Sequence, residues 1–205
     1  TCEALELLRD LHFSEVPDKL HWLLALLRGR CFFAQNQFQR AQQDLIYALN
    51  ELPPYESLKS EQKQEALLLH LHLADTYREL QQFEVALPHY KTTLRMINSE
   101  TPSGHVAEAH HGIAFIFYAQ SRKQLHTQFM QHNEGRENEE IKNTKREMLL
   151  REALIHAENA RVLYRSVSDL ALEAMLTCFT ALIRQELGDD SGMQDILQSL
   201  LANWF

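Results

Sequence analysis

Histidine is the residue type in this chain with the widest capacity for chemistry, since 11 of the 205 residues are His. Neutral imidazole is a metal ligand, and two ligands on one helix face must be three or four residues apart. His70 and His72 are two residues apart, and His110 and His111 are adjacent, so the rings of each pair diverge. No His pair has the required spacing, and the sequence holds no H-E-x-x-H or C-x-x-C motif. We therefore expect hydrogen-bonded, partly buried rings and surface rings, with no metal and no cofactor.

Groups for nucleophilic or acid–base catalysis show no productive arrangement. The sequence has no G-x-S-x-G motif and no Gly-rich phosphate loop. Glu137, Glu139 and Glu140 belong to a stretch from 134 to 147 in which nine of fourteen residues are charged. Such a run is typical of a solvated surface rather than of a paired acid and base. The sequence therefore predicts a protein that is not an enzyme.

Charge and cysteine content restrict the partners and the compartment. The formal net charge of −8 disfavours direct nucleic-acid binding, which needs clustered Lys and Arg. Cys2, Cys31 and Cys178 are an odd set without paired spacing, which indicates free thiols in a reducing compartment, and we expect the cytoplasm. No apolar run reaches the roughly 18 residues of a membrane span, so no membrane partner is expected.

The elements that must position these residues are clearest in the stretch 66–98. Apolar residues recur there at helical spacing on both sides of a turn, Leu80-Gln81-Gln82-Phe83. Small residues stand where two helices would approach closely, and aromatic residues stand beside them. These positions are Leu69, Leu73, Ala74 and Tyr77 before the turn and Phe83, Ala86, Leu87, Tyr90 and Leu94 after it.

This order of apolar, small and aromatic positions resembles the tetratricopeptide repeat (TPR), a helix–turn–helix unit of 34 residues. An earlier unit, from about Lys19 to Pro53, has the same pattern at a constant offset of 45 residues. The connection from Pro54 to about Gln64 accounts for the extra length. Its matching positions are Gly29, Phe32, Phe38, Ala41, Leu45 and Ala48.

Two further units are expected downstream. The third starts near Ser103, with Gly112 and Phe115 in the small and aromatic places, and its first helix continues to about Gln131. After a break at 133–135, a second long helix is predicted from Arg136 to Ser166. The fourth unit covers about Val167 to Phe205, with a turn at 188–192. The spacing also predicts that the aromatic residues at repeat positions, Phe115 included, form core.

The resemblance implies an all-α right-handed superhelix of antiparallel helix pairs, a TPR-like solenoid of about four repeats and nine helices. We expect one domain over residues 1–205, with a helical hairpin around 120–150 that projects from the stack. A short helix at 3–12 followed by Pro17 is like the second helix of a preceding repeat, so the chain is expected to be a fragment of a longer protein.

In this family the first helices of successive repeats line a concave surface that binds a protein or peptide segment. Arg30 and Arg78 are expected to anchor carboxylate groups there, because Arg offers a planar fork of donors. Polar side chains at the centre of this surface, with apolar side chains beside them, suit a peptide, because charged groups fix its register and apolar contacts supply affinity. The predicted partner-binding residues are Leu26, Arg30, Phe33, His72, Asp75, Arg78, Glu79, His110, Ile113 and Phe117.

Several functions remain open within this reading. Family members that hold the carboxylate tail of chaperones carry a Lys–Asn–Asn–Lys–Arg set, and this chain lacks it, which argues against a chaperone-tail adaptor. A general scaffold for protein–protein interaction and the sensor or oligomerisation half of a bacterial helix-turn-helix transcriptional regulator both fit, and a helical enzyme is a third alternative. Homodimerisation through the long hairpin is a further possibility, suggested by Phe129, Met130, Met148 and Leu149.

Overall fold

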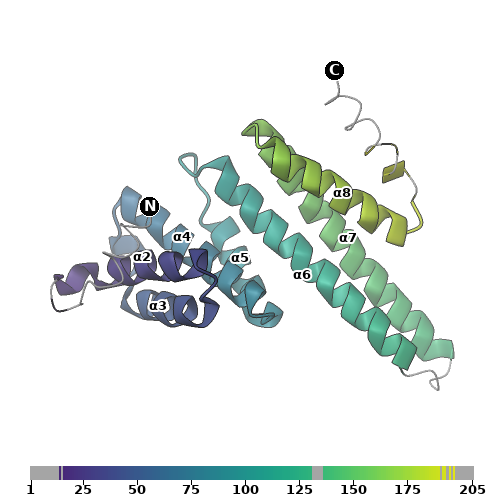
Figure 1. Cartoon of the computed structure of the whole chain (residues 1–205), viewed down its shortest axis with the longest axis horizontal. Helices are drawn as coiled ribbons and strands as arrows, with labels where there is room; N and C mark the ends of the chain where they lie inside the picture. Colours follow the sequence, from purple (N-terminus) through teal and green to yellow (C-terminus); the bar gives the residue numbers. More distant parts are fainter. Residues whose placement is uncertain are drawn as a thin grey trace. The chain divides into compact units, whose positions relative to one another are not determined.

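The structure is a computed structural model that describes residues 16–130 and 136–189, with single positions at 14, 191, 192, 194 and 196. For 127–130 and 136–140 only the backbone is described. Within these residues the protein is all-α, and its seven α-helices pack as sequential antiparallel pairs (Figure 1). The chain divides into two compact units, unit 1 (Thr1–Thr101) and unit 2 (Pro102–Phe205). The all-α prediction is confirmed.

Unit 1 consists of two helical hairpins. Helix α2 packs on α3, α4 packs on α5, and α4 also contacts both α3 and α2. Short 3₁₀ turns, η2 (Asp18–Leu20) and η3 (Tyr55–Ser57), precede α2 and α4. The bounds are α2 (His21–Ala34), α3 (Phe38–Glu51), α4 (Ser60–Glu79) and α5 (Phe83–Arg95).

The turn between α4 and α5 lies where the sequence predicted it. Gln81 has a φ of +58°, and the Gln82 amide donates to the carbonyl oxygen of Tyr77, five residues earlier, at 2.8 Å. This left-handed residue and long-span hydrogen bond are the marks of a Schellman ending. The α2–α3 turn repeats both features around Asn36, whose φ is +57°. The predicted offset of 45 residues therefore relates two turns of the same geometry.

Small residues let the helices of unit 1 approach closely. Ala74 and Ala86 have no exposed surface, as predicted for the narrow positions of the hairpin. Gly29 on α2 also lies close to α3, because a Cβ atom added there would lie 2.6 Å from Leu45 Cγ. The predicted contact of Gly29 with a neighbouring helix is thus confirmed, and it explains why the position holds no side chain.

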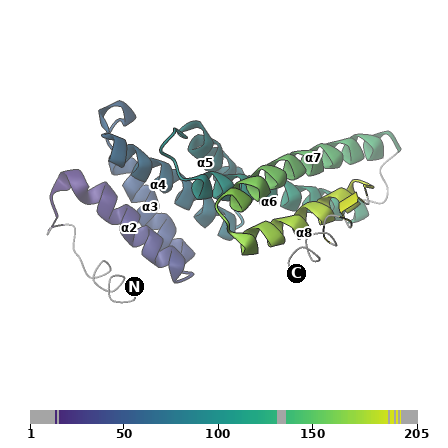
Figure 2. The ribbon, with the colours of Figure 1, turned by 90° about the horizontal axis from the view of Figure 1, so that it is seen from above.

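Unit 2 is dominated by two long antiparallel helices, α6 (Ser103–Met130) and α7 (Arg136–Ser166), with α8 (Leu170–Glu186) alongside α7. Figures 1 and 2 both show α6 and α7 side by side over their whole length. The predicted hairpin of long helices is confirmed, while the predicted break at 133–135 lies outside the described residues. The core of the unit is built from α6, α7 and α8 and includes Ala107, Ala114, Leu150, Ala153, Ala157, Ala160, Tyr164, Leu176 and Ile183.

The expected core position of Phe115 is wrong, since 42% of its surface is exposed. The neighbours Ala114, Phe117 and Tyr118 pack in or against the core of unit 2 instead. Because α7 and α8 both contact that side of α6, the buried face is rotated away from Phe115. The predicted helices at 3–12 and after the 188–192 turn fall outside the described residues, apart from isolated positions.

Candidate functional site

The candidate surface begins on α2, where predicted partner-binding residues differ in exposure. Arg30 is exposed and makes no ion pair within the described part of the chain. Phe33 is half-buried, and its ring lies edge-on against Phe38 with the centroids 5.4 Å apart. Leu26 has no exposed surface and lies in the core beneath this face. On α2, therefore, Arg30 and the outer part of Phe33 are the groups that a partner could touch.

Helix α4 continues the surface with a fixed ionic network. Asp75 is only 2% exposed, and its Oδ1 accepts a hydrogen bond from the Tyr90 hydroxyl of α5 at 2.5 Å. The Arg78 guanidinium lies 3.3 Å from the same Oδ1 and donates to Glu79 Oε1 at 3.0 Å. A buried carboxylate held from both sides fixes the orientation of Arg78 at the edge of the core.

The network of Asp75, Arg78 and Glu79 holds more negative than positive charge, which affects the kind of group that it can bind. Burial opposes the charged form of Arg78, but Tyr90, Asp75 and Glu79 outweigh it, and the pKa of Arg78 is raised. One guanidinium therefore stands against two carboxylates, which leaves the α4 end of the surface net negative. An incoming carboxylate gains less from Arg78 here than from Arg30, whereas a basic group is attracted by half-exposed Glu79.

The remaining predicted residues are partly covered side chains. His72 on α4 is half-buried within unit 1. In unit 2, Ile113 is fully buried, and His110 and Phe117 are half-buried beside His156 of α7. Seven of the ten predicted residues thus belong to unit 1 and three to unit 2. Their role in partner binding stays a prediction.

Two histidine pairs, one in each unit, join the helices of a hairpin. In unit 1 the Nδ1 atoms of His70 on α4 and His89 on α5 are 3.0 Å apart, and Tyr77 stacks on His89. In unit 2 the Nδ1 atoms of His110 and His156 are 2.8 Å apart. One nitrogen of each pair must carry the proton and the other accept it, so each bond needs at least one neutral ring.

Burial favours the neutral form of three of these rings, those of His70, His89 and His110. It lowers the pKa of His70 to about 4, with a further contribution from His89, and it also lowers the pKa values of His89 and His110. Neutral imidazole can ligate metals, but the residues that the structure describes contain no group of three or more His, Cys, Asp or Glu placed to hold an ion. Each pair is a hydrogen bond between the two helices of its hairpin.

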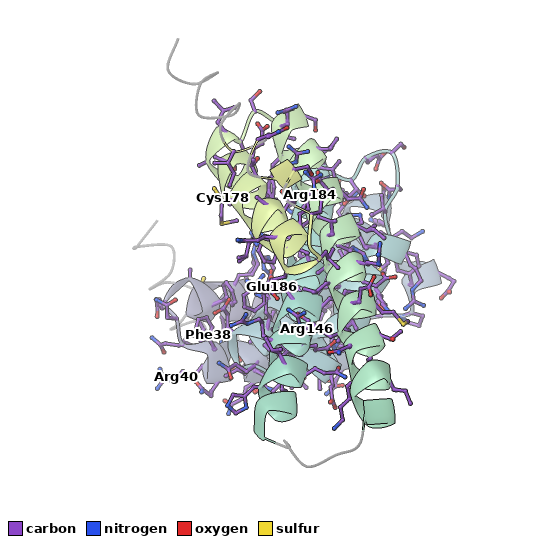
Figure 3. The ribbon with its side chains drawn as sticks, turned by 90° about the vertical axis from the view of Figure 1, so that its right-hand side faces the viewer. Phe38, Arg40, Arg146, Cys178, Arg184 and Glu186 are labelled. Carbon is purple, nitrogen blue, oxygen red and sulfur yellow. The ribbon has the colours of Figure 1, made fainter. Side chains whose placement is uncertain are left out.

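Two carboxylates of unit 2, those of Glu186 and Glu158, are paired with arginine side chains. Glu186 on α8 accepts from the Tyr118 hydroxyl at 2.8 Å, from Arg122 at 3.2 Å and from Arg146 on α7 (Figure 3). About three turns further along α7, Glu158 accepts from Arg161 and from Arg184 of α8. These hydrogen bonds and ion pairs join α6, α7 and α8 within unit 2.

Sequence reasoning missed the pairs that cross between helices. It predicted hydrogen-bonded rings for the histidines, which is confirmed, but it searched for His partners only along one helix. A signal was present, because His110 and His156 are equally far in sequence from residue 133, where the break had been placed. Residues symmetric about a hairpin turn face each other in antiparallel helices. The Tyr90–Asp75 bond was missed because both residues had been assigned by repeat position alone.

Comparison with known proteins gives no further guidance, because no protein-family model and no curated protein matches this chain. None of the helices in the described part of the chain combines the length and apolar character that crossing a bilayer requires.

Proposed function

We propose that this protein is a non-catalytic scaffold whose helical pairs form a TPR-like right-handed array, and that its surface on α2 and α4 binds a peptide segment of a partner protein. The repeated turn geometry supports the array. Beyond the two turns of unit 1, Ser168 and Gly188 have φ values of +60° and +80°. In these turns Asp169 and Asp189 donate to the carbonyl oxygens five residues earlier, at 3.0 and 2.9 Å. One turn type used four times is typical of repeat architecture.

The observation that carries the binding proposal is the pairing of an exposed cation with a fixed, net acidic network on adjacent helices. Helices α2 and α4 are in contact, and they present Arg30 and Glu79 with half-buried Phe33. Arg30 favours an acidic group of the peptide, Glu79 favours a basic one, and Phe33 offers apolar area. Opposite charges at two points fix the register of an extended segment.

Charge reversal tests this surface. A display library of random peptides would be panned on the intact chain, and enriched peptides would be titrated by calorimetry. We expect Arg30→Glu to weaken their binding roughly tenfold or more, since an attraction becomes a repulsion. Glu79→Lys should select a different peptide set, richer in acidic residues.

The matched control is Lys91→Glu, a charge reversal at an exposed position on α5. It should leave affinity within about twofold, because rim charges away from a site change little. If no peptide is enriched, or if Arg30→Glu and Lys91→Glu have equal effects, the surface on α2 and α4 is not the binding site.

A further inference from the structure

Helix α7 carries a row of exposed apolar side chains at intervals of seven residues. Ile141, Met148, Ile155 and Val162 are 64%, 63%, 55% and 61% exposed. Residues seven apart drift by only about 20° around a helix, so these four form one stripe. At 1.5 Å per residue the stripe is about 32 Å long. We refer to these four residues as the α7 stripe.

The stripe lies on a second apolar face of the helix. The core-facing side of α7 contributes Leu150, Ala153, Ala157 and Ala160 to unit 2, and these residues are at most 1% exposed. A helix that packs on one side of a domain normally has a polar opposite side. The four large apolar residues in line on that opposite side therefore indicate that this face of α7 contacts a partner surface.

The size of the α7 stripe is sufficient for a small interface. Each side chain leaves about 100 Å² of apolar surface in water, or about 400 Å² in total, within the range of roughly 300–600 Å² that often marks function. Two such stripes face to face, with the aliphatic stems of Lys145, Arg151 and Glu152 beside them, bury about 1,000 Å². That is the lower end of specific protein–protein interfaces.

We propose that two copies of the chain associate through the α7 stripe, antiparallel, about a twofold axis close to Leu149 and Leu150. In a twofold dimer the same patch of both copies forms the interface. When the evenly spaced α7 stripe meets a second stripe that runs in the opposite direction, the side chains of one copy fit between those of the other. Met148 of one copy lies between Met148 and Ile155 of the other. The seven-residue period keeps this contact along the helix, as in a coiled coil.

Charges beside the α7 stripe select the antiparallel orientation. Exposed Glu147 and Arg151 lie on one edge, while Lys145 and Glu152 lie on the other. In the antiparallel arrangement Arg151 of one copy meets Glu147 of the second copy, and Glu152 meets Lys145. A parallel arrangement in register would bring Glu147 beside Glu152 and Arg151 beside Arg151. Opposite charges therefore face each other across the interface only when the two α7 helices run in opposite directions.

The oligomeric state tests the association. Sedimentation equilibrium of the intact chain should show a weak dimer, because the buried area is small. The variant Met148→Glu/Ile155→Glu should be monomeric up to about 200 μM, since charges would face each other in the interface. Val85→Glu, at a 43% exposed apolar position on α5, is the matched control and should keep the dimer. A monomeric parent at that concentration, or a dimer that survives Met148→Glu/Ile155→Glu, overturns the proposal.

A charge swap tests the orientation. Glu152→Lys alone should weaken dimerisation about tenfold, because Lys145 of the second copy is then opposed by a like charge. Adding Lys145→Glu should restore the dimer to within about twofold of the parent. In a parallel pair Glu152→Lys would instead remove the repulsion from Glu147 and strengthen association. Strengthening by the single variant therefore overturns the antiparallel arrangement, and circular dichroism of each variant verifies its helical fold.

Discussion

The buried imidazole pairs are the groups whose protonation bears most directly on stability at the residue scale. His70 and His89 face each other across the α4–α5 hairpin, with the Tyr77 ring stacked on His89. The influences that lower the pKa of His70 to about 4 are burial first and then the charge of His89. For His89 the cause is burial. Protonating both rings would place two like charges in contact at a half-buried position, where water screens them only in part.

The sign of the resulting pH dependence follows from the direction of the shift. The pKa of His70 is about 4 in the folded protein and 6.5 in an unfolded chain, so the unfolded chain binds the proton more readily. The stability contributed by neutral His70 is complete above pH 6.5 and is lost as the pH falls to about 4. We expect the advantage of the parent over His70→Gln, measured by urea unfolding, to shrink by up to about 3 kcal/mol across this window.

Ala74→Leu provides the control for this titration. Ala74 has no exposed surface, so the larger side chain should destabilise the fold by about 1–3 kcal/mol through overpacking at every pH. Its deficit relative to the parent should stay constant between pH 7 and about 4, since Leu does not titrate. If the free energies of unfolding of the parent and of His70→Gln changed equally with pH, the pH dependence would not come from this histidine pair.

At the scale of the elements, the turns determine where helices end, and three of them hold a non-glycine residue with positive φ. Gln81, Ser168 and Asn36 have positive φ, which costs a residue with a Cβ about 1–2 kcal/mol and costs Asn less. Gly188 occupies the corresponding place after α8 without that cost.

Replacing Gln81 by Gly should therefore stabilise the protein. The relief of strain exceeds the entropy that Gly adds to the unfolded chain, and we expect a gain of about 0.5–1 kcal/mol in urea unfolding. Gln82→Gly is the control, because Gln82 has a φ of −89° and no strain to relieve. It should destabilise by about 0.5–1 kcal/mol. A loss of stability in Gln81→Gly would show that the Gln81 side chain contributes more than its backbone costs.

The elements were predictable because periodicity and turns are local properties of the sequence. The end of α4, the start of α5 at Phe83 and the start of α7 at Arg136 all lie where apolar spacing placed them. The exposure of Phe115 was not predictable, since it depends on which side of α6 the helices α7 and α8 cover. The same holds for the candidate site. Sequence indicated Arg78 as a charged group, but the carboxylates of Asp75 and Glu79 that neutralise it became visible only with the helices in place.

At the scale of the whole molecule, each unit has its own core and its own polar network. Tyr90→Phe should cost about 1–3 kcal/mol by leaving buried Asp75 without its hydroxyl donor. Glu186→Gln should cost a similar amount, about 1–3 kcal/mol, because Arg122 and Arg146 lose a charged partner. The two networks share no residue, so we expect the losses in the double variant to add within about 0.5 kcal/mol in urea unfolding.

The control for this cycle lies inside unit 1. Tyr90→Phe combined with Asp75→Asn changes both partners of one hydrogen bond, and the coupling energy should exceed about 0.5 kcal/mol. If Tyr90→Phe and Glu186→Gln showed as large a coupling energy as Tyr90→Phe and Asp75→Asn, the polar networks of units 1 and 2 would be energetically linked.

The long hairpin of unit 2 also implies an order in time. Gln124 Nε2 donates to the Lys142 carbonyl at 3.4 Å across 18 residues of chain, while His110 and His156 meet across 46. Closing a longer loop costs more entropy, by about 0.6 kcal/mol for each doubling of length. We therefore expect pairing to start between the ends of α6 and α7 that are closest in sequence and to continue outward along both helices. The His110–His156 bond is therefore expected to form after the Gln124–Lys142 bond, and on a ribosome it must wait until 21 of the 31 residues of α7 have been synthesised.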